Sequence, residues 1–555
     1  MEKINILWVD DEIDLLKPHV LFLEEKGYRV VTANNGDDAL NLIDDCHFDI
    51  VFLDEQMPGL SGLETLSEIK NSYPDLPVVM ITKSEEENLM DDAIGSKISD
   101  YLIKPVNPKQ ILLSIKKNIE TKRLVSEKTT SAYQQEFRNI GMALNDDLSH
   151  ERWIDIYKKI VYWELELESS NDSGMNEILQ MQKVEANNLF CRFIQSNYLS
   201  WLNASGSDEN FTGKREGGSG GGLSHFRQLA EKGSGGGAAP PVLSHTLFKN
   251  KVIPLFENRT TVFLILIDNL RYDQWKSFLP IINEHFRIET EELYYSILPT
   301  ATQYSRNAIF AGLLPSEIEK RFPQLWVCDT DERGKNMHEE EFIDAQLKRL
   351  GKDVKYSYTK ITNLKDGKKL IDNINNLMNN QLNVIIYKFV DMLSHARTEI
   401  EIIKELADDE AAYRSLTLSW FEHSPLLETL RQIARLSQAG HGKEAKLVIT
   451  TDHGAIRVKE PSKVVGDKNI TTNLRYKQGK LLNYDNKDVF AVGNPADAFL
   501  PKPNVSTSYI FAKEDKYFVY PNNYNYYANF FKNTFQHGGI SMEEMLIPVV
   551  VISTK

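Results

Sequence analysis

The stretch VFLILIDNLRYDQW, residues 262–275, joins a continuous apolar run to a polar turn that begins at Asp268. An unbroken apolar run is typical of a strand buried on both faces of a parallel sheet. The expected strands of this kind are residues 261–267, 384–390, 447–451 and 546–552. Residues 242–555 are therefore predicted to form an α/β domain, with polar groups gathered at the carboxyl edge of its sheet.

Carboxylates and imidazoles follow these strands in a definite order, with one threonine among them. They are Asp268, Thr302 (in SILPTATQYSRNAIFAG), Asp391 and His395 (KFVDMLSH), Asp452 and His453 (VITTDHGA), and His537 (FQHGGIS). Asp391 and His395 are four residues apart and share one face if the chain turns helical there. Each residue alone could be a cap or turn residue, and Thr302 could be an N-cap. The complete order points instead to one site.

The donor types in this set predict a binuclear metal centre. Carboxylates and imidazoles without thiolates suit Zn²⁺, with Mn²⁺ next. Two cations about 3.5–4 Å apart would clamp the attacking and leaving oxygens of a phosphoester, and would activate a threonine hydroxyl. We expect in-line phosphoryl transfer through Thr302, with Thr300 as the alternative nucleophile. Arg271 and Arg306 are close in sequence and could hold a phosphate or form surface ion pairs.

A second set of polar residues lies near the N-terminus. Residues 1–120 alternate short apolar runs with helical patterns, and the runs are residues 4–9, 28–33, 49–53, 77–81 and 100–103. Five strands alternating with five helices predict a doubly wound, five-stranded parallel sheet of the flavodoxin type. Asp10, Asp11 and Asp54 follow the first and third strands and should meet at its carboxyl edge.

The chemistry of this second set is that of a phosphate-accepting switch. Three carboxylates can hold one Mg²⁺, and Asp54 is placed to accept a phosphoryl group. Thr82 could bond that group, Lys104 could pair with its charge, and Tyr101 could change its burial as Thr82 moves. Solvated loop acids and a core aromatic are the ordinary alternative.

The middle of the chain contains two segments of different composition. Residues 121–203 show apolar residues only at helical spacing, as at Trp153, Ile156 and Ile160, and are expected to form a helical bundle. Residues 204–241 contain GGSGGGLSHFRQLAEKGSGGGAAPP, two Gly/Ser runs around a short peptide. We interpret them as an engineered or disordered loop, the alternative being a natural low-complexity segment.

Composition narrows the class of protein. The formal net charge of -15 argues against coating nucleic acid, and no helix-turn-helix pattern follows residue 120. Three scattered cysteines predict neither a disulfide framework nor a thiolate metal site. The sequence MEKINILWVDDE has no signal pattern, and no apolar run reaches membrane-spanning length. A cytoplasmic protein is expected.

Residues 1–120 resemble response-regulator receiver domains through WVDDE, FLDEQMPGLSGLE, ITKS and YLIKP. The resemblance implies that Asp54 is phosphorylated by a sensor histidine kinase. It implies Mg²⁺ bound by Asp11, Asp54 and the carbonyl of Gln56, with Asp10 helping through water. Thr82 and Tyr101 would be the switch pair beside Lys104, and phosphorylation would favour a homodimer.

Residues 242–555 resemble the PglZ domain of the alkaline phosphatase superfamily, through the segments quoted above. The resemblance implies two Zn²⁺ ions. One would be bound by Asp268, Thr302, Asp452 and His453, and the other by Asp391, His395 and His537. The PTAT spacing is similar to that of the phosphodiesterase-like branch, with Thr302 as nucleophile.

The order of receiver, helical bundle and PglZ domain is similar to that of PorX-type response regulators. That resemblance implies control of type IX secretion, a PorY-like sensor kinase and an extracytoplasmic-function sigma factor as partners. It also implies linear or cyclic oligonucleotides as substrates. The alternative is a non-enzymatic adaptor that binds a sigma factor and whose metals are structural, although such a site would not need a hydroxyl nucleophile.

Overall fold

The computed structural model describes residues 4–74, 76–83, 98–170, 173–205, 239–256, 260–327, 336–438, 444–467 and 470–555. The chain forms two compact units, Met1–Glu136 with Glu166–Met175, and Phe137–Leu165 with Asn176–Lys555. Each unit is described by itself. The Gly/Ser stretch predicted to be a loop lies outside the described residues from 206 to 238.

The first unit contains a five-stranded parallel sheet in the order β2-β1-β3-β4-β5. Its strands are β1 (Asn5–Val9), β2 (Arg29–Ala33), β3 (Ile50–Asp54), β4 (Val78–Thr82) and β5 (Asp100–Ile103). Its described helices are η1 (Ile13–Leu16), α1 (Lys17–Glu25), α2 (Gly36–Asp45), α3 (Gly62–Ser72) and α5 (Pro108–Ile115). The doubly wound prediction is confirmed, and the helix expected between β4 and β5 falls on residues 84–97, outside the described part.

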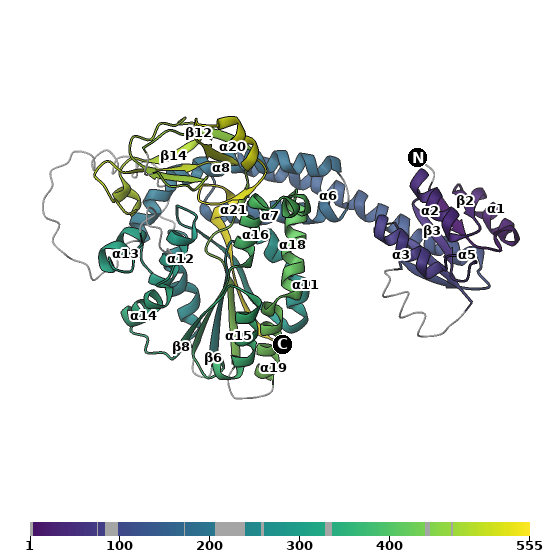
Figure 1. The fold of residues 1–555 in the computed structure, drawn as a ribbon, viewed down its shortest axis with the longest axis horizontal. Coiled ribbons are helices and arrows are strands. Elements are labelled where there is room, and N and C mark those ends of the chain that lie inside the picture. The colour runs from purple at the N-terminus through teal and green to yellow at the C-terminus, as the bar shows by residue number, and fades with distance from the viewer. Residues whose placement is uncertain are drawn as a thin grey trace. The chain divides into compact units, whose positions relative to one another are not determined.

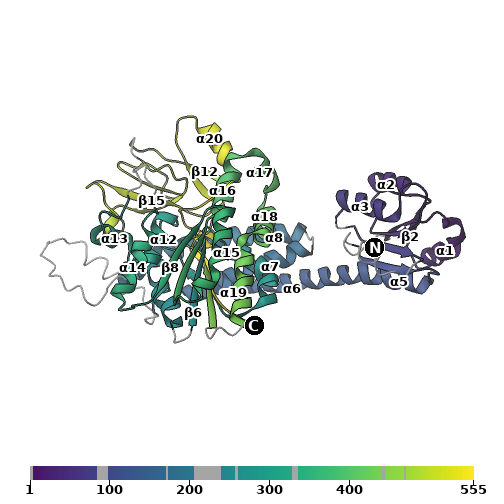
Figure 2. The same cartoon turned by 60° about the horizontal axis from the view of Figure 1, so that its bottom comes forward.

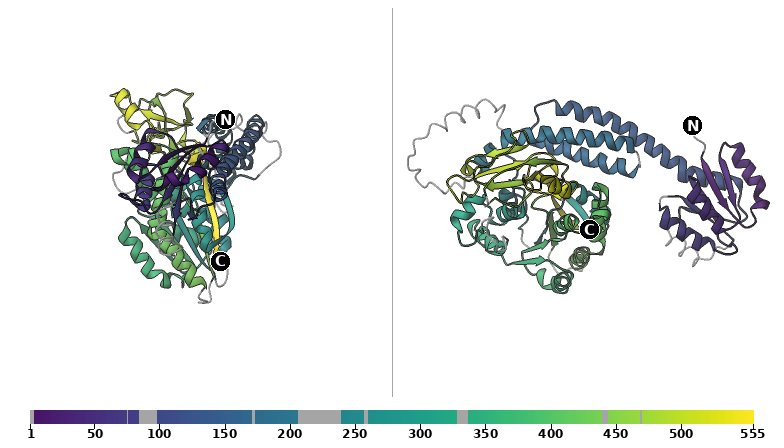
Figure 3. Two further views of the ribbon diagram at one scale, coloured as in Figure 1. Left: turned by 90° about the vertical axis from the view of Figure 1, so that its right-hand side faces the viewer. Right: turned by 45° about the horizontal axis from the view of Figure 1, so that its top comes forward.

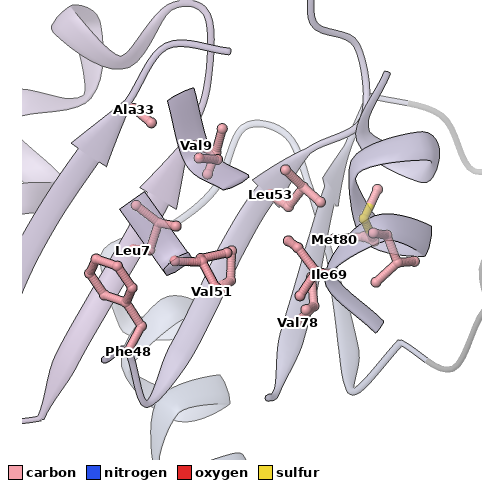
Figure 4. Packing of buried hydrophobic residues seen from close by; sticks show 12 residues of the cluster. Leu7, Val9, Ala33, Phe48, Val51, Leu53, Ile69, Val78 and Met80 are labelled. Atoms are coloured by element: carbon pink, nitrogen blue, oxygen red, sulfur yellow. The ribbon is translucent and has the colours of Figure 1, made fainter. Parts of the chain in front are cut away.

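Alternate side chains of these strands enter different cores. Leu7, Val51 and Met80 pack with α2 and α3 on one face, as Figure 4 shows. Trp8 and Phe52 pack on the other face with α1 and α5. Burial on both faces explains the continuous apolar runs. It also fixes the register that brings Asp10 and Asp54 to one edge.

Three long helices follow, α6 (Thr121–Leu144), α7 (His150–Ser169) and α8 (Ser173–Ser205), after the short η2 (Lys116–Glu120). Figure 3 shows them in its right-hand view. The predicted helical spacing is confirmed, because Trp153, Ile156 and Ile160 are all buried. The expected helices therefore exist, and the boundaries between the two compact units fall within α6, α7 and α8.

The second unit is built on a six-stranded mixed sheet in the order β7-β18-β10-β6-β9-β8. The strands are β6 (Thr260–Ile267), β7 (Phe286–Tyr295), β8 (Tyr356–Ile361), β9 (Leu382–Tyr387), β10 (Glu444–Thr450) and β18 (Leu546–Thr554). β8, β9, β6 and β10 run parallel, whereas β18 is antiparallel to both β10 and β7. The predicted α/β domain is confirmed.

Helices cover this sheet on both sides (Figures 1 and 2). On one side lie α12 (Thr302–Ala311), α13 (Pro315–Arg321) and α14 (Glu339–Arg349). On the other lie α11 (Tyr272–His285), α15 (Leu364–Leu377), α18 (Glu410–His423) and α19 (Pro425–Gln438). Short helices before β6 are α10 (Ser244–Leu247), η3 (Phe248–Val252) and η4 (Ile253–Leu255), and α16 (Phe389–Glu399) and α17 (Glu401–Leu406) follow β9.

Smaller sheets lie between β10 and β18 in the chain. They pair β11 (Ile456–Arg457) with β17 (Phe535–Gln536), β12 (Glu460–Lys463) with β16 (Lys516–Val519), and β15 (Ser508–Ala512) with β13 (Tyr476–Gly479) and β14 (Val489–Val492). The remaining helices there are η5 (Pro495–Ala498), α20 (Tyr524–Phe531) and α21 (Met542–Met545).

One strand ends earlier than expected. The apolar run 384–390 was expected to be a single strand, but β9 stops at Tyr387 and α16 begins at Phe389. Both pieces are apolar because both are buried, so periodicity could not separate them. In the described part of the chain, no helix is both long enough and apolar enough to cross a bilayer.

Candidate functional site

One group of predicted ligands lies deep in the second unit. Asp268 follows β6, and Asp452 and His453 follow the neighbouring strand β10, so the sheet register brings them together. One ligand atom from each lies within 4.8 Å of the others, and all three side chains are buried. Thr302 begins α12, where its Oγ1 is 3.0 Å from His453 Nε2 and 3.4 Å from Asp268 Oδ1. The hydroxyl therefore faces the group of ligands.

The second group lies closer to solvent. Asp391 and His395 share one face of α16, as their spacing predicted, and His537 follows β17. One ligand atom from each again lies within 4.8 Å of the others. Nε2 of His395 and Nε2 of His537 are each 3.6 Å from an oxygen of Asp391. The His395 side chain is 62% exposed, so this group opens to the surface.

Backbone carbonyls orient one imidazole of each group. His453 Nδ1 is 3.1 Å from the Gly454 carbonyl, and His537 Nδ1 is 3.1 Å from the Thr300 carbonyl. A proton on each Nδ1 leaves the Nε2 lone pair facing the carboxylates. Metal-binding histidines commonly have this outer partner. The donor chemistry and its orientation thus fit a divalent cation in each group.

Burial sets the protonation of the inner ligands. It lowers the pKa of His453 to about 3, with the neighbouring His537 adding to the effect, so the imidazole is neutral as a ligand must be. Burial raises the pKa of Asp452 to about 7, although Arg306 opposes the rise. For Asp268, burial raises the pKa, but Arg306 and His453 outweigh it and leave the value below the ordinary one. A bound cation would favour both charged carboxylates.

Arg306 is the charged neighbour of the inner group. It is fully buried, its guanidinium pairs with Asp268, and its Nη2 is 2.9 Å from Asp452 Oδ2. Its Nη1 is 3.5 Å from Glu339 Oε1. The alternative of a surface ion pair is therefore wrong for Arg306. It is also wrong for Arg271, which is buried and pairs with Asp273 and Glu410.

Sequence reasoning missed Glu339, because nothing in its local sequence distinguishes it from its acidic neighbours. The spacing of Arg306, one helical turn after Thr302, was the available signal for the arginine.

The alternative nucleophile Thr300 has a different environment. Its buried hydroxyl donates to the Gly539 carbonyl at 2.9 Å and accepts from Gly538 N–H at 3.0 Å. These bonds anchor the loop that carries His537. Thr302, at the start of a ten-residue helix with its partial positive charge, is better placed to meet a phosphate.

The first unit gathers the second predicted set. Asp10, Asp11 and Asp54 each place one oxygen within 4.8 Å of the others. Lys104 Nζ is 2.9 Å from an oxygen of Asp10 and 2.9 Å from one of Asp54. Burial raises the pKa of Asp54, and Lys104 opposes that rise. The carboxylate oxygens of these three aspartates are hard donors of the kind that bind Mg²⁺.

The remaining switch candidates surround this edge. The Thr82 hydroxyl donates to the Glu55 carboxylate, and the Tyr101 ring is 42% exposed. Asp11, Glu55 and Gln56 line a surface hollow with Met57, Pro58, Ser61 and Leu63.

Comparison with known families agrees with the fold. Residues 6–116 match the response regulator receiver domain, residues 123–202 match the PorX response regulator linker domain, and residues 247–552 match the BREX system PglZ alkaline phosphatase-like domain. The chain is thus a response regulator with a phosphatase-like effector. It belongs to the PglZ alkaline phosphatase-like family, in the domain order of PorX-type response regulators.

Individual relatives cover only part of this chain. The transcriptional regulatory protein ZraR of Klebsiella oxytoca is 34% identical over 140 residues, covering 25% of this chain and 32% of its own. ResD of Bacillus subtilis is 32% identical over 112 residues, covering 20% of this chain and 46% of its own. The chain therefore spans between about a third and a half of these two relatives. A receiver domain from Methanospirillum hungatei is 27% identical with a TM-score of 0.21, covering 22% of this chain and 96% of that structure.

Proposed function

We propose that the protein is a phosphorylation-controlled, zinc-dependent phosphodiesterase. The observation that carries the proposal is the position of the Thr302 hydroxyl, 3.0 Å from His453 Nε2 in the inner ligand group. A structural metal site needs no hydroxyl at that place. The outer group of Asp391, His395 and His537 supplies a second set of donors.

The proposed reaction is in-line transfer in two steps. Thr302 Oγ forms a bond to phosphorus while the bond from phosphorus to the leaving oxygen breaks; the hydroxyl proton goes to solvent and the leaving oxygen takes one up. Water then cleaves the phosphothreonine and restores the hydroxyl. Zinc ions in the two groups would stabilise the charge on the attacking and leaving oxygens. The N-terminus of α12 would hold the phosphate oxygens.

The first unit would supply control. We propose that Asp54 accepts the phosphoryl group from a PorY-like sensor histidine kinase, with Mg²⁺ held by Asp10, Asp11, Asp54 and the Gln56 carbonyl. Lys104 would then pair with the phosphoryl group, and Thr82 and Tyr101 would respond. Phosphorylation would favour a homodimer. The functional divisions would be residues 1–120, 121–203 and 242–555.

The proposed substrates are linear or cyclic oligonucleotides, and the proposed output is control of type IX secretion with an extracytoplasmic-function sigma factor as partner. The charge of -15 is compatible with a nucleotide held through cations, but not with broad nucleic-acid coating.

Hydrolysis of a chromogenic phosphodiester and of a short oligonucleotide tests the proposal, with zinc added and Thr302→Ala as the variant. Loss of turnover with unchanged metal content is expected. Equal turnover in the wild type and Thr302→Ala would contradict the assignment of Thr302 as the nucleophile. Metal binding without turnover in the wild type would favour the adaptor that binds a sigma factor.

A further inference from the structure

A buried network of charges connects the linker helices to the loops that hold the metal ligands. The linker contributes Glu164 from α7 and Lys183 and Asn187 from α8, and all three side chains are buried. Lys183 Nζ is 3.0 Å from Glu164 Oε2 and 3.3 Å from Glu543 Oε1. Asn187 donates to Glu543 Oε2 at 3.0 Å and accepts from the backbone N–H of Met542 at 2.8 Å.

A second branch leads from Glu164 to the turn after Asp268. Glu164 Oε1 is 3.0 Å from Nη1 of Arg414, and the same nitrogen is 2.9 Å from Asp273 Oδ2. Asp273 pairs in turn with Arg271 through two hydrogen bonds. Arg271 is three residues after Asp268, so this branch ends beside the first ligand of the inner group.

The charges of the network depend on one another. Burial alone raises the pKa of Glu164, but Lys183 and Arg414 outweigh it and keep the carboxylate ionised. Burial alone lowers the pKa of Lys183, but Glu164 and Glu543 outweigh it and raise the value above the ordinary one. Loss of one member therefore leaves a buried charge without its partner.

The segment Met542–Met545 carries the first branch to both histidines. The carbonyl of Glu544 accepts from Gly454 N–H at 3.2 Å, directly after His453. A Cβ on Gly454 would lie 2.1 Å from the Glu543 carbonyl oxygen, so the two backbones are in close contact. Glu544 Oε1 accepts from Gly539 N–H at 2.9 Å, two residues after His537. This segment is therefore bonded to the chain one residue after His453 and two residues after His537.

We propose that Lys183, Glu164 and Asn187 are positioning residues of the metal centre. They touch neither substrate nor ligand atoms, and they act by holding the Met542–Met545 segment and the Arg271–Asp273 turn. The linker is then part of the catalytic apparatus, and its α7 and α8 can transmit a change to His453, His537 and Asp268. This inference rests on the proposed metal-dependent function.

Zinc affinity of the full-length protein tests the inference with a readout other than activity. A chromogenic chelator competes for zinc in excess Mg²⁺, so that the hard-cation site of the first unit stays filled. The variants are Lys183→Met, which removes the charge, and Lys183→Arg, which keeps it. Glu185→Gln is the matched control, because Glu185 is an exposed neighbour on the same helix.

Lys183→Met is expected to weaken zinc binding about 10-fold, the lower end of the effect of losing a direct outer partner of a metal ligand, because Lys183 acts on the ligands through Glu543. Lys183→Arg should restore most of the affinity, and Glu185→Gln should match the wild type. If Lys183→Met does not fold, Asn187→Ala takes its place, because it removes both bonds to Met542–Met545 without changing a charge. A folded variant with lower thermal stability but wild-type zinc affinity would overturn the inference.

The wild-type protein separates this inference from the proposed reaction. Tight zinc binding without phosphodiester hydrolysis would end the proposed reaction while the comparison of affinities still decides the positioning role. A wild type that binds no zinc would overturn both.

Discussion

The imidazole rings of His453 and His537 are stacked, with centroids 4.1 Å apart and planes 18° from parallel. His453 belongs to the inner ligand group and His537 to the outer one. The two groups of ligands are therefore in direct contact through these stacked rings. Neutral rings can stack in this way, and the low pKa of His453 is consistent with it.

The buried Arg306 should stabilise the metal-free protein strongly. Arg306→Met would leave Asp268 and Asp452 without their counter-charge, so we expect a loss of about 3–5 kcal/mol in the free energy of unfolding. Zinc should reduce that loss, because the cation would compensate the same carboxylates. Urea unfolding with and without zinc measures both effects. Arg152→Met, at an exposed site on α7, is the control, and an equal loss with and without zinc would contradict the shared role of the carboxylates.

Substitutions of the two threonines in the PTAT segment should have different effects, one mainly on stability and the other on turnover. Thr300→Ala removes two buried hydrogen bonds and should lower the free energy of unfolding by about 1–3 kcal/mol. Hydrolysis should fall without being abolished, because the loop that carries His537 loses part of its anchor. Thr302→Ala should abolish hydrolysis with little loss of stability. Parallel urea unfolding and phosphodiester assays check the pair. The reverse pattern would make Thr300 the nucleophile.

Lys477 should make stability depend on pH. Burial lowers the pKa of Lys477 to about 7, whereas the unfolded lysine keeps an ordinary value near 10.5. Between these values the unfolded state binds more protons, so stability should rise with pH by up to about 1.4 kcal/mol per unit. Lys477→Met should remove that part of the slope between pH 7 and 9. Lys487→Met, at an exposed site, is the control, and an unchanged slope in Lys477→Met would refute the assignment.

Phosphorylation should release Lys104 from its present partners. Lys104 bridges Asp10 and Asp54, and a phosphoryl group on Asp54 would compete for its charge. With Mg²⁺ and a phosphoryl analogue, the wild type should shift towards a dimer in light-scattering chromatography. The molar mass of Asp54→Ala should be the same with and without the analogue. The same response in the wild type and Asp54→Ala would contradict the proposal that phosphorylation of Asp54 controls dimerisation.

The positions of most candidate residues were predictable because they follow buried strands. Asp268 and Asp452 each follow a buried strand, so their position at the carboxyl edge of the sheet was predictable, whereas the pairing of these two strands was not. Asp391 and His395 were predictable from their spacing on a helix.

Other features depend on pairings that a single sequence does not reveal. Glu339 reaches Arg306 from a helix 33 residues away. The antiparallel direction of β18 was equally hidden, because a strand buried on both faces has the same apolar run in either direction. Lys183 on α8 forms an ion pair with Glu543, which lies hundreds of residues later in the chain. The local sequence around Lys183 suggests only a solvated lysine.

The place of β18 in the central sheet bears on how the chain is made. This strand is held between β10 and β7, yet it is synthesised after every other strand of the sheet. The receiver sheet, by contrast, is complete once Ile103 has emerged from the ribosome. A nascent chain can therefore carry a complete receiver sheet for some time before its metal centre exists, and in that interval β10 and β7 each lack a neighbour.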